Sequence, residues 1–81
     1  MYKYQLSKHL ERVVAKLQKK DKQLYENIMN KMREVIHSSD IEHYKNLRYD
    51  LKEFKRVHVG SFVLVFKFDK LNNFVFFDDF D

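Results

Sequence analysis

The 81-residue chain contains no cysteine and no proline, and its only glycine is Gly60. Without cysteine it can form neither a disulfide nor a thiolate zinc site, and it has no cysteine nucleophile. A phosphate-binding loop and a dinucleotide-binding fingerprint each need several glycines at fixed spacing, so both are excluded. The absence of cysteine is compatible with a reducing compartment, and we expect a cytoplasmic protein.

Long apolar runs are also missing. No window approaches the roughly 18 apolar residues of a membrane span, and residues 1–8 lack the apolar core of a secretory signal. We therefore expect no membrane contact. The chain does contain eight Phe and five Tyr, and each aromatic side chain can bury roughly 150–250 Å². These side chains can build the core of one small domain, which we expect to span residues 1–81.

The charge is moderately positive and unevenly distributed. The net charge is +4; residues 1–56 carry 14 basic and 8 acidic side chains, whereas residues 57–81 carry 2 and 4. A positive excess favours contact with a polyanion such as RNA, because phosphate contacts release counterions. On charge alone, however, a solvated surface is the simpler interpretation.

Hydrophobic periodicity predicts the elements of the first half. Alternation of Tyr2, Tyr4 and Leu6 with polar residues predicts a strand. Residues 8–37 then show two apolar stripes at helical spacing, separated by a short polar break, which predicts a helical hairpin. Ser7 and Asp21 are the expected N-caps of its two helices.

The second half predicts strands at residues 54–59, 62–68 and 74–80, which are rich in Phe and Val. Gly60 and Ser61 suit a two-residue type II′ turn between the first two of these strands, because that turn favours glycine first. Residues 40–53 show no clear period, and we expect a loop there with one helical turn near residues 49–52. The predicted order is β-α-α-β-β-β, an α+β fold with the helical hairpin packed on one face of a mainly antiparallel sheet.

A turn at Gly60 and Ser61 fixes which residues share a face of the sheet. Val59 would pair with Phe62, and His58, Val57, Arg56 and Lys55 would pair with Val63, Leu64, Val65 and Phe66 in turn. The core face would carry Val57, Val59, Phe62, Leu64 and Phe66, and the opposite face Phe54, Arg56, His58, Val63, Val65 and Lys67.

The second of these faces is suited to an RNA backbone, because Arg binds phosphate through paired hydrogen bonds and an imidazole can exchange protons near neutral pH. The alternative is that Arg56, His58 and Lys67 are ordinary solvated residues. The four histidines show no metal-binding spacing, so we expect neither a metal nor a cofactor.

The element order, together with the segment LRYDLKEFKRVHVGSFVLVF at residues 47–66, resembles the RelE/ParE toxin superfamily of prokaryotic toxin–antitoxin systems. The stretch VGSF at residues 59–62 is the most specific part of the likeness. RelE-like members are ribosome-dependent endonucleases of messenger RNA, and an antitoxin neutralises them. The resemblance implies that Arg56 and His58 are catalytic; as RNA contacts we expect Arg48, Lys52, Lys55 and Lys67.

The sequence departs from the family pattern in two places. Val63 stands where the family has an arginine, and the family's C-terminal basic residue and tyrosine would lie beyond Asp81. The chain is therefore expected to be either shortened at its C-terminus or catalytically incomplete, which leaves enzymatic activity open. Two alternatives are a ParE-like gyrase inhibitor and a catalytically silent module that only binds an antitoxin. The last is favoured by a strand with Phe on both sides, namely Phe74, Phe76, Phe77 and Phe80.

Overall fold

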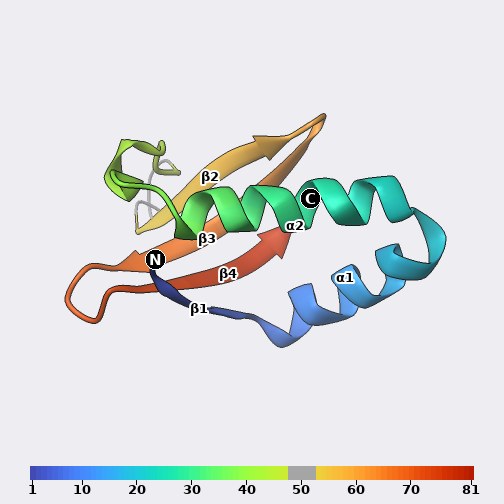
Figure 1. The fold of residues 1–81 in the computed structure, drawn as a ribbon, viewed down its shortest axis with the longest axis horizontal. Coiled ribbons are helices and arrows are strands. Elements are labelled where there is room, and N and C mark those ends of the chain that lie inside the picture. Colours follow the sequence, from blue (N-terminus) through green and yellow to red (C-terminus); the bar gives the residue numbers. More distant parts are fainter. Residues whose placement is uncertain (48–52) are drawn as a thin grey trace.

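A computed structural model describes residues 1–47 and 53–81 and shows two helices packed on a four-stranded sheet (Figure 1). The elements are β1 (Lys3–Leu6), α1 (Lys8–Lys20), α2 (Lys22–Ile36), the 3₁₀ turn η1 (Ile41–His43), β2 (Phe54–Val59), β3 (Phe62–Asp69) and β4 (Phe74–Phe80). This arrangement confirms the predicted α+β class and element order. None of the helices in the described residues is long and apolar enough to cross a membrane.

Both helices begin where the sequence predicts. The Ser7 hydroxyl accepts a hydrogen bond from the Leu10 N–H at 3.0 Å, and the Asp21 carboxylate accepts one from the Leu24 N–H at 3.1 Å. Each bond satisfies a backbone donor that has no partner within its helix. The two caps therefore confirm the helical hairpin, whose helices meet at Asp21.

The sheet has the strand order β1-β4-β3-β2. β1 runs parallel to β4, whereas the β2–β3 and β3–β4 pairs are antiparallel. The predicted β2–β3 register is confirmed at every pair, from Lys55 opposite Phe66 to Val59 opposite Phe62. Gly60 has a φ of 63°, and Ser61 is not among the residues with positive φ, which is the pattern of a type II′ turn.

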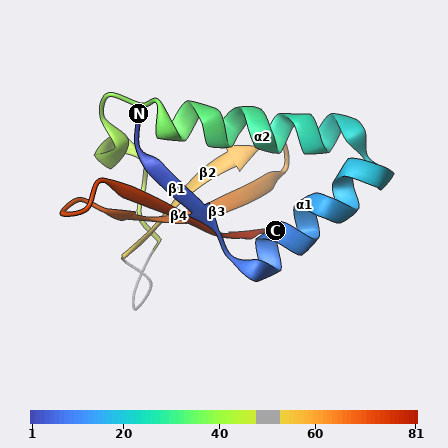
Figure 2. The same cartoon turned by 60° about the horizontal axis from the view of Figure 1, so that its bottom comes forward.

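The helices cover only one face of the sheet (Figure 2). That face supplies most of the sheet's contribution to the core: Val59, Leu64, Phe66, Val75, Phe77 and Phe80, with Val57 and Phe68 partly buried against it. α1 adds Leu10, and α2 adds Ile28, Met32, Val35 and Ile36. We call this the inner face and the opposite one the outer face.

Phe62 is a correction to the predicted core. It lies on the inner face but is 40% exposed, because it stands at the tip of the β2–β3 hairpin. Its ring stacks on the ring of Phe80, with 5.2 Å between the centroids. Phe62 therefore caps one end of the core instead of filling it.

A β-bulge places an extra aromatic side chain inside. Phe66 pairs with Phe77 and Val65 with Asp79, so one residue of β4 is left over. The shift lets Phe77 and Phe80 both face inward although they are three residues apart. The Ser7 hydroxyl donates a hydrogen bond to the Asp78 carbonyl at 2.6 Å, which ties the start of α1 to the bulge.

Residues 41–47, which follow α2, make more contacts with the rest of the fold than the sequence indicates. Ile41 in η1 is buried in the core. Residues 45–47 then run along the edge of β2, where the Leu47 N–H donates to the Phe54 carbonyl and the Arg56 N–H to the Lys45 carbonyl. The helical turn predicted near residues 49–52 lies outside the described residues.

Candidate functional site

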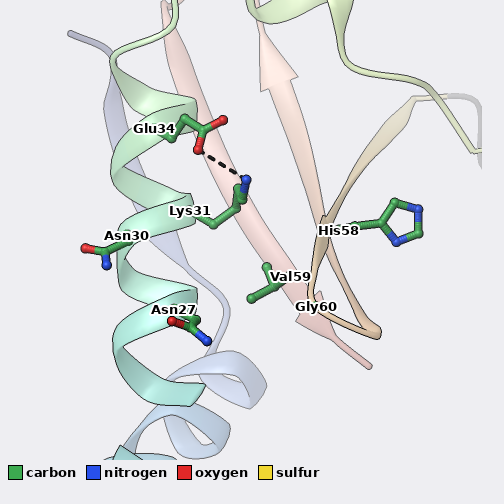
Figure 3. Close-up of a pocket in the computed structure, with 7 residues that line it drawn as sticks. All are labelled: Asn27, Asn30, Lys31, Glu34, His58, Val59 and Gly60. Atoms are coloured by element: carbon green, nitrogen blue, oxygen red, sulfur yellow. Dashed lines mark hydrogen bonds and ion pairs between the residues drawn. The ribbon is translucent and has the colours of Figure 1, made fainter. Parts of the chain in front are cut away.

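Arg56 and His58 share the outer face of β2, as the register predicts. They pair with Val65 and Val63, which also belong to that face. The imidazole of His58 is exposed and points away from α2, whereas the side chain of Val59 points toward it (Figure 3). Residues two apart on a strand are separated by roughly 7 Å, so one phosphodiester group can contact both side chains.

Lys67 faces the same solvent from the neighbouring strand. Its ammonium lies 3.7 Å from a carboxylate oxygen of Glu53 and 5.2 Å from the ring centroid of Phe54. Both contacts are partly exposed, so each is weak and can be exchanged for a phosphate contact. In the described part of the chain Arg56 makes no ion pair, which leaves its guanidinium available to an anion.

Lys55 is placed differently from Lys67, the other predicted RNA contact among the described residues. Its partner across the ladder is Phe66, so it starts from the inner side of β2. The ammonium donates to the carbonyls of Glu42 and Tyr44 at 3.4 and 3.1 Å and to the Asn46 side-chain oxygen at 2.8 Å. These contacts use all three donors of the ammonium and hold the segment after η1 against β2.

The same segment also brings Tyr44 against the core. Its ring meets the ring of Phe66 edge-on, with 5.7 Å between centroids. Burial, with a further contribution from the Glu34 carboxylate, raises the pKa of the Tyr44 phenol above its ordinary value of 10.0. Arg48 and Lys52, the remaining predicted RNA contacts, lie outside the described residues.

The structure adds aromatic residues to the outer face that the register of β2 and β3 alone could not assign. Phe74 and Phe76 of β4 pair with Asp69 and Lys67, and these four residues line a shallow hollow of about 240 Å³. Hydrogen bonds from the side chain and, to a smaller extent, the backbone N–H of Asn72 hold the pKa of the Asp69 carboxyl below its ordinary value of 3.8. In the sequence, only the Phe-rich pattern of the last strand indicates that Phe side chains such as Phe74 and Phe76 lie on its outer side.

A second hollow, of about 300 Å³, lies between α2 and the end of β2 (Figure 3). Asn27, Asn30, Lys31 and Glu34 line it from the helix, and the Lys31 ammonium is 3.2 Å from Glu34. Because Lys31 is paired and the His58 imidazole points to the other side, the hollow contains no evident catalytic pair. Within residues 1–47 and 53–81, no three His, Asp or Glu side chains are grouped to hold a metal ion.

Comparisons with known proteins give relatives over the full length of the chain. It is 45% identical to a Methanocaldococcus jannaschii protein named "Putative toxin RelE4", covering 100% of this chain and 85% of that protein. It is 35% identical to an uncharacterized protein of Methanosarcina mazei, covering 100% of this chain and 93% of that protein. The solution structure of conserved hypothetical protein HP0892 from Helicobacter pylori superimposes with a TM-score of 0.64 at 25% identity, covering 100% of this chain and 93% of that one. No protein-family model matches.

Proposed function

The chain belongs to the RelE family of toxins, and on that premise we propose that it cuts messenger RNA on the ribosome and so inhibits translation in the cytoplasm. Its partner would be a cognate antitoxin. The observation that supports the proposal most directly is the joint placement of Arg56 and His58 on the outer face of β2. A guanidinium and an imidazole at that separation can act on the same phosphodiester group.

The proposed reaction is internal transfer of the RNA phosphate. The 2′-oxygen attacks the adjacent phosphorus and loses its proton, while the bond from phosphorus to the 5′-oxygen of the next nucleotide breaks and that oxygen gains a proton. The products are a 2′,3′-cyclic phosphate and a 5′-hydroxyl. His58 would move a proton in this reaction, and Arg56 would stabilise the added negative charge on the phosphorane.

The surroundings of this pair suggest that catalysis is slow. Val63, opposite His58, has a side chain that cannot contact a phosphate, although the family pattern has an arginine there. Removing one donor to a transition state typically lowers the rate by about 10²–10³. We therefore propose an incomplete catalytic set, with Lys67 as the next available cation on the outer face.

Val63 also favours a second candidate, a toxin that inhibits gyrase without cutting nucleic acid. Such a protein needs a binding surface but no phosphate-stabilising arginine. A third candidate is a module that only binds an antitoxin, and the half-buried Phe74 and Phe76 on the uncovered face favour it, because a partner could cover them.

The experiment compares the wild-type chain with the double variant Arg56→Ala/His58→Ala in a translating extract, followed by mapping of messenger-RNA ends. We expect cleavage by the wild type and at least a hundredfold slower cleavage by the variant. Arg33→Ala/His37→Ala, a matched pair of exposed residues near the end of α2, should cleave like the wild type. The unfolding free energy of the site variant should stay within about 0.5 kcal/mol of the wild type, since the His58 side chain is exposed and the Arg56 side chain is partly exposed.

A gyrase supercoiling assay separates the candidates. Intact messenger RNA together with inhibited supercoiling would favour the gyrase inhibitor and contradict the nuclease. Intact messenger RNA and unaffected gyrase, together with tight binding of an antitoxin, would favour the third candidate, a module that only binds an antitoxin. Equal cleavage by the wild type and by the Arg56/His58 variant would remove these residues from the reaction.

A further inference from the structure

α1 carries a charge equal to that of the whole protein. It contains five Lys or Arg residues and one carboxylate, Glu11, a balance of +4. Subtracting these residues from the 16 basic and 12 acidic side chains of the chain leaves 11 of each. The rest of the chain, loops included, is therefore neutral as a whole, and the net positive charge equals that of one helix of 13 residues.

Four of these cations form a narrow stripe: Arg12, Lys16, Lys19 and Lys20. At 100° per residue they fall within a sector of about 100°, whose centre lies roughly 110–130° around the helix axis from the partly buried Leu17 and the buried Leu10. All four side chains are exposed. We call this set the α1 stripe.

Helix stability explains only part of the α1 stripe. Lys19 and Lys20 stand in the last turn, where the helix dipole favours cations. Arg12 and Lys16 are mid-helix, and the like-charge pairs Arg12–Lys16 and Lys16–Lys20, four residues apart, destabilise a helix. Within the described residues none of the four forms an ion pair that would offset this repulsion.

The neighbouring helix shows the arrangement expected of a merely solvated surface. On α2, Lys31 pairs with Glu34 at 3.2 Å, and the Arg33 guanidinium donates to the Asn30 side chain at 2.7 Å. Two of the three cations of α2 therefore have a partner on the same helix, and the carboxylates of Glu26 and Glu34 leave that helix a balance of only +1. The α1 stripe has no such partners among the described residues, and its field extends into solvent.

Lys8, the fifth cation of α1, is less suited to binding an anion. It stands three residues before Glu11 and at the end of the helix that meets β4. There His9 lies 3.1 Å from the Asp79 carboxylate, and Asp78 and Asp81 are close in sequence. These carboxylates reduce the positive field at the start of α1, so the α1 stripe begins at Arg12.

The outer face of the sheet offers few phosphate contacts of its own. Within the described strands β2 and β3, Arg56 is the one outer-face cation without an ion pair, since Lys67 is shared with Glu53. An enzyme that acts on RNA needs several phosphate contacts for affinity at physiological salt. The α1 stripe supplies them from a different element.

We propose that the α1 stripe is a second RNA-contacting surface, which binds the phosphate backbone of base-paired RNA without reading its sequence. The choice of RNA as the polyanion rests on the proposed function, because a ribosome presents mostly base-paired RNA. Arg12, Lys16 and Lys19 make the central contacts, and the outer face is left to engage a single strand.

The test uses the full chain and a fluorescent 20-base-pair RNA duplex, with binding followed by anisotropy between 50 and 300 mM KCl. The stripe variant is Arg12→Gln/Lys16→Gln/Lys19→Gln. The matched control, Arg33→Gln/Lys45→Gln/Lys70→Gln, removes one Arg and two Lys from exposed positions elsewhere, so both variants have the same net charge. Glutamine keeps the helix propensity of the residues it replaces, and circular dichroism checks that both variants are folded.

We expect the stripe variant to bind the duplex at least tenfold more weakly at 50 mM KCl and the control to change less than threefold. The slope of log affinity against log salt should flatten by roughly 0.9 for each phosphate that the variant no longer neutralises, or about 2–3 in all. Equal weakening in both variants would show that only net charge matters and would overturn the proposal. So would a stripe variant that still binds the duplex but no longer binds vesicles containing phosphatidylserine, since the surface would then face a membrane.

The Arg56→Ala/His58→Ala variant separates this inference from the nuclease. It should bind the duplex within threefold of the wild type whether or not the wild type cuts messenger RNA. If the nuclease proposal fails while the stripe variant still binds the duplex more weakly than the control, the α1 stripe is an RNA-binding surface of a protein that does not cut messenger RNA. If cleavage is confirmed while the stripe variant binds normally, only the α1 stripe is wrong.

Discussion

The inner and outer faces of the sheet are made from the same strands, yet neighbouring residues along a strand have different roles. On β4, Phe77 is fully buried beneath the helices, whereas Phe76 faces the other way and is only half-buried. On β2, Val59 is buried and His58 is exposed. The inner face is closed and apolar, and the outer face combines cations with aromatic rings.

This difference separates the residues that stabilise the fold from those that we propose act on RNA. Substitutions on the inner face remove core packing, so the fold restricts them. Substitutions on the outer face change the chemistry of a partly exposed surface at little cost in stability. Val63 illustrates the second case: it lies at a partly exposed outer position, where the resemblance to the RelE/ParE superfamily implies an arginine, and the β2–β3 register is intact there.

The largest expected effect tests this separation with two adjacent phenylalanines. Phe77→Ala removes a fully buried ring and should lower the unfolding free energy by about 3–5 kcal/mol. Phe76→Ala, on the outer face, should cost about 1 kcal/mol or less. Urea denaturation measures both. If the alanine variant of Phe77 does not fold, Phe77→Leu keeps part of the ring's volume and should still cost more than Phe76→Ala; equal losses would contradict the distinction between the faces.

The turn at Gly60 decides which residues lie on which face, because a slip of one residue would exchange them. A Cβ at Gly60 would meet no atom within 4 Å, but the φ of 63° is unfavourable for any residue with a side chain. Gly60→Ala should therefore cost about 1–2 kcal/mol through the backbone alone. Ser61→Ala, at the next position, should change stability by less than about 0.5 kcal/mol. Urea denaturation of the two variants makes this comparison, and a neutral Gly60→Ala would mean that the register does not depend on this turn.

Much of the fold follows from local sequence signals. β2 and β4 have the predicted bounds, and β3 extends one residue further, to Asp69. Apolar alternation ends at turn residues, and Ser7 and Asp21 have short acceptor side chains at the points where helical spacing begins. The outward placement of Arg56 and His58 follows from the same alternation and the single glycine.

Other features depend on contacts between segments far apart in the chain. The bulge at Asp78 is favoured by packing of Phe80 in the core and by the hydroxyl of Ser7, 71 residues away, neither of which a local pattern reveals. Residues 41–47 have no period, so their pairing with β2 could not be foreseen. The alternation along β2 also predicts that the Lys55 side chain leaves the backbone on the inner side. It does not predict where the ammonium at the end of the four-carbon side chain binds.

The smallest expected effect on stability comes from comparing Lys55 and Arg56, which are adjacent cations on opposite sides of β2. Lys55→Met keeps the apolar part of the side chain but removes the hydrogen bonds to Glu42, Tyr44 and Asn46. A net hydrogen bond contributes roughly 0.5–1.5 kcal/mol and these bonds are partly exposed, so we expect stability to fall by about 1 kcal/mol in total. Urea denaturation measures that decrease, with Lys45→Met at an exposed neighbouring position as the control.

RNA binding should weaken equally in the Lys55→Met and Lys45→Met variants, since each removes one charge. If Lys55→Met instead leaves stability unchanged and weakens RNA binding more than Lys45→Met does, its ammonium exchanges its backbone partners for phosphate, and Lys55 belongs with Arg56 among the RNA contacts.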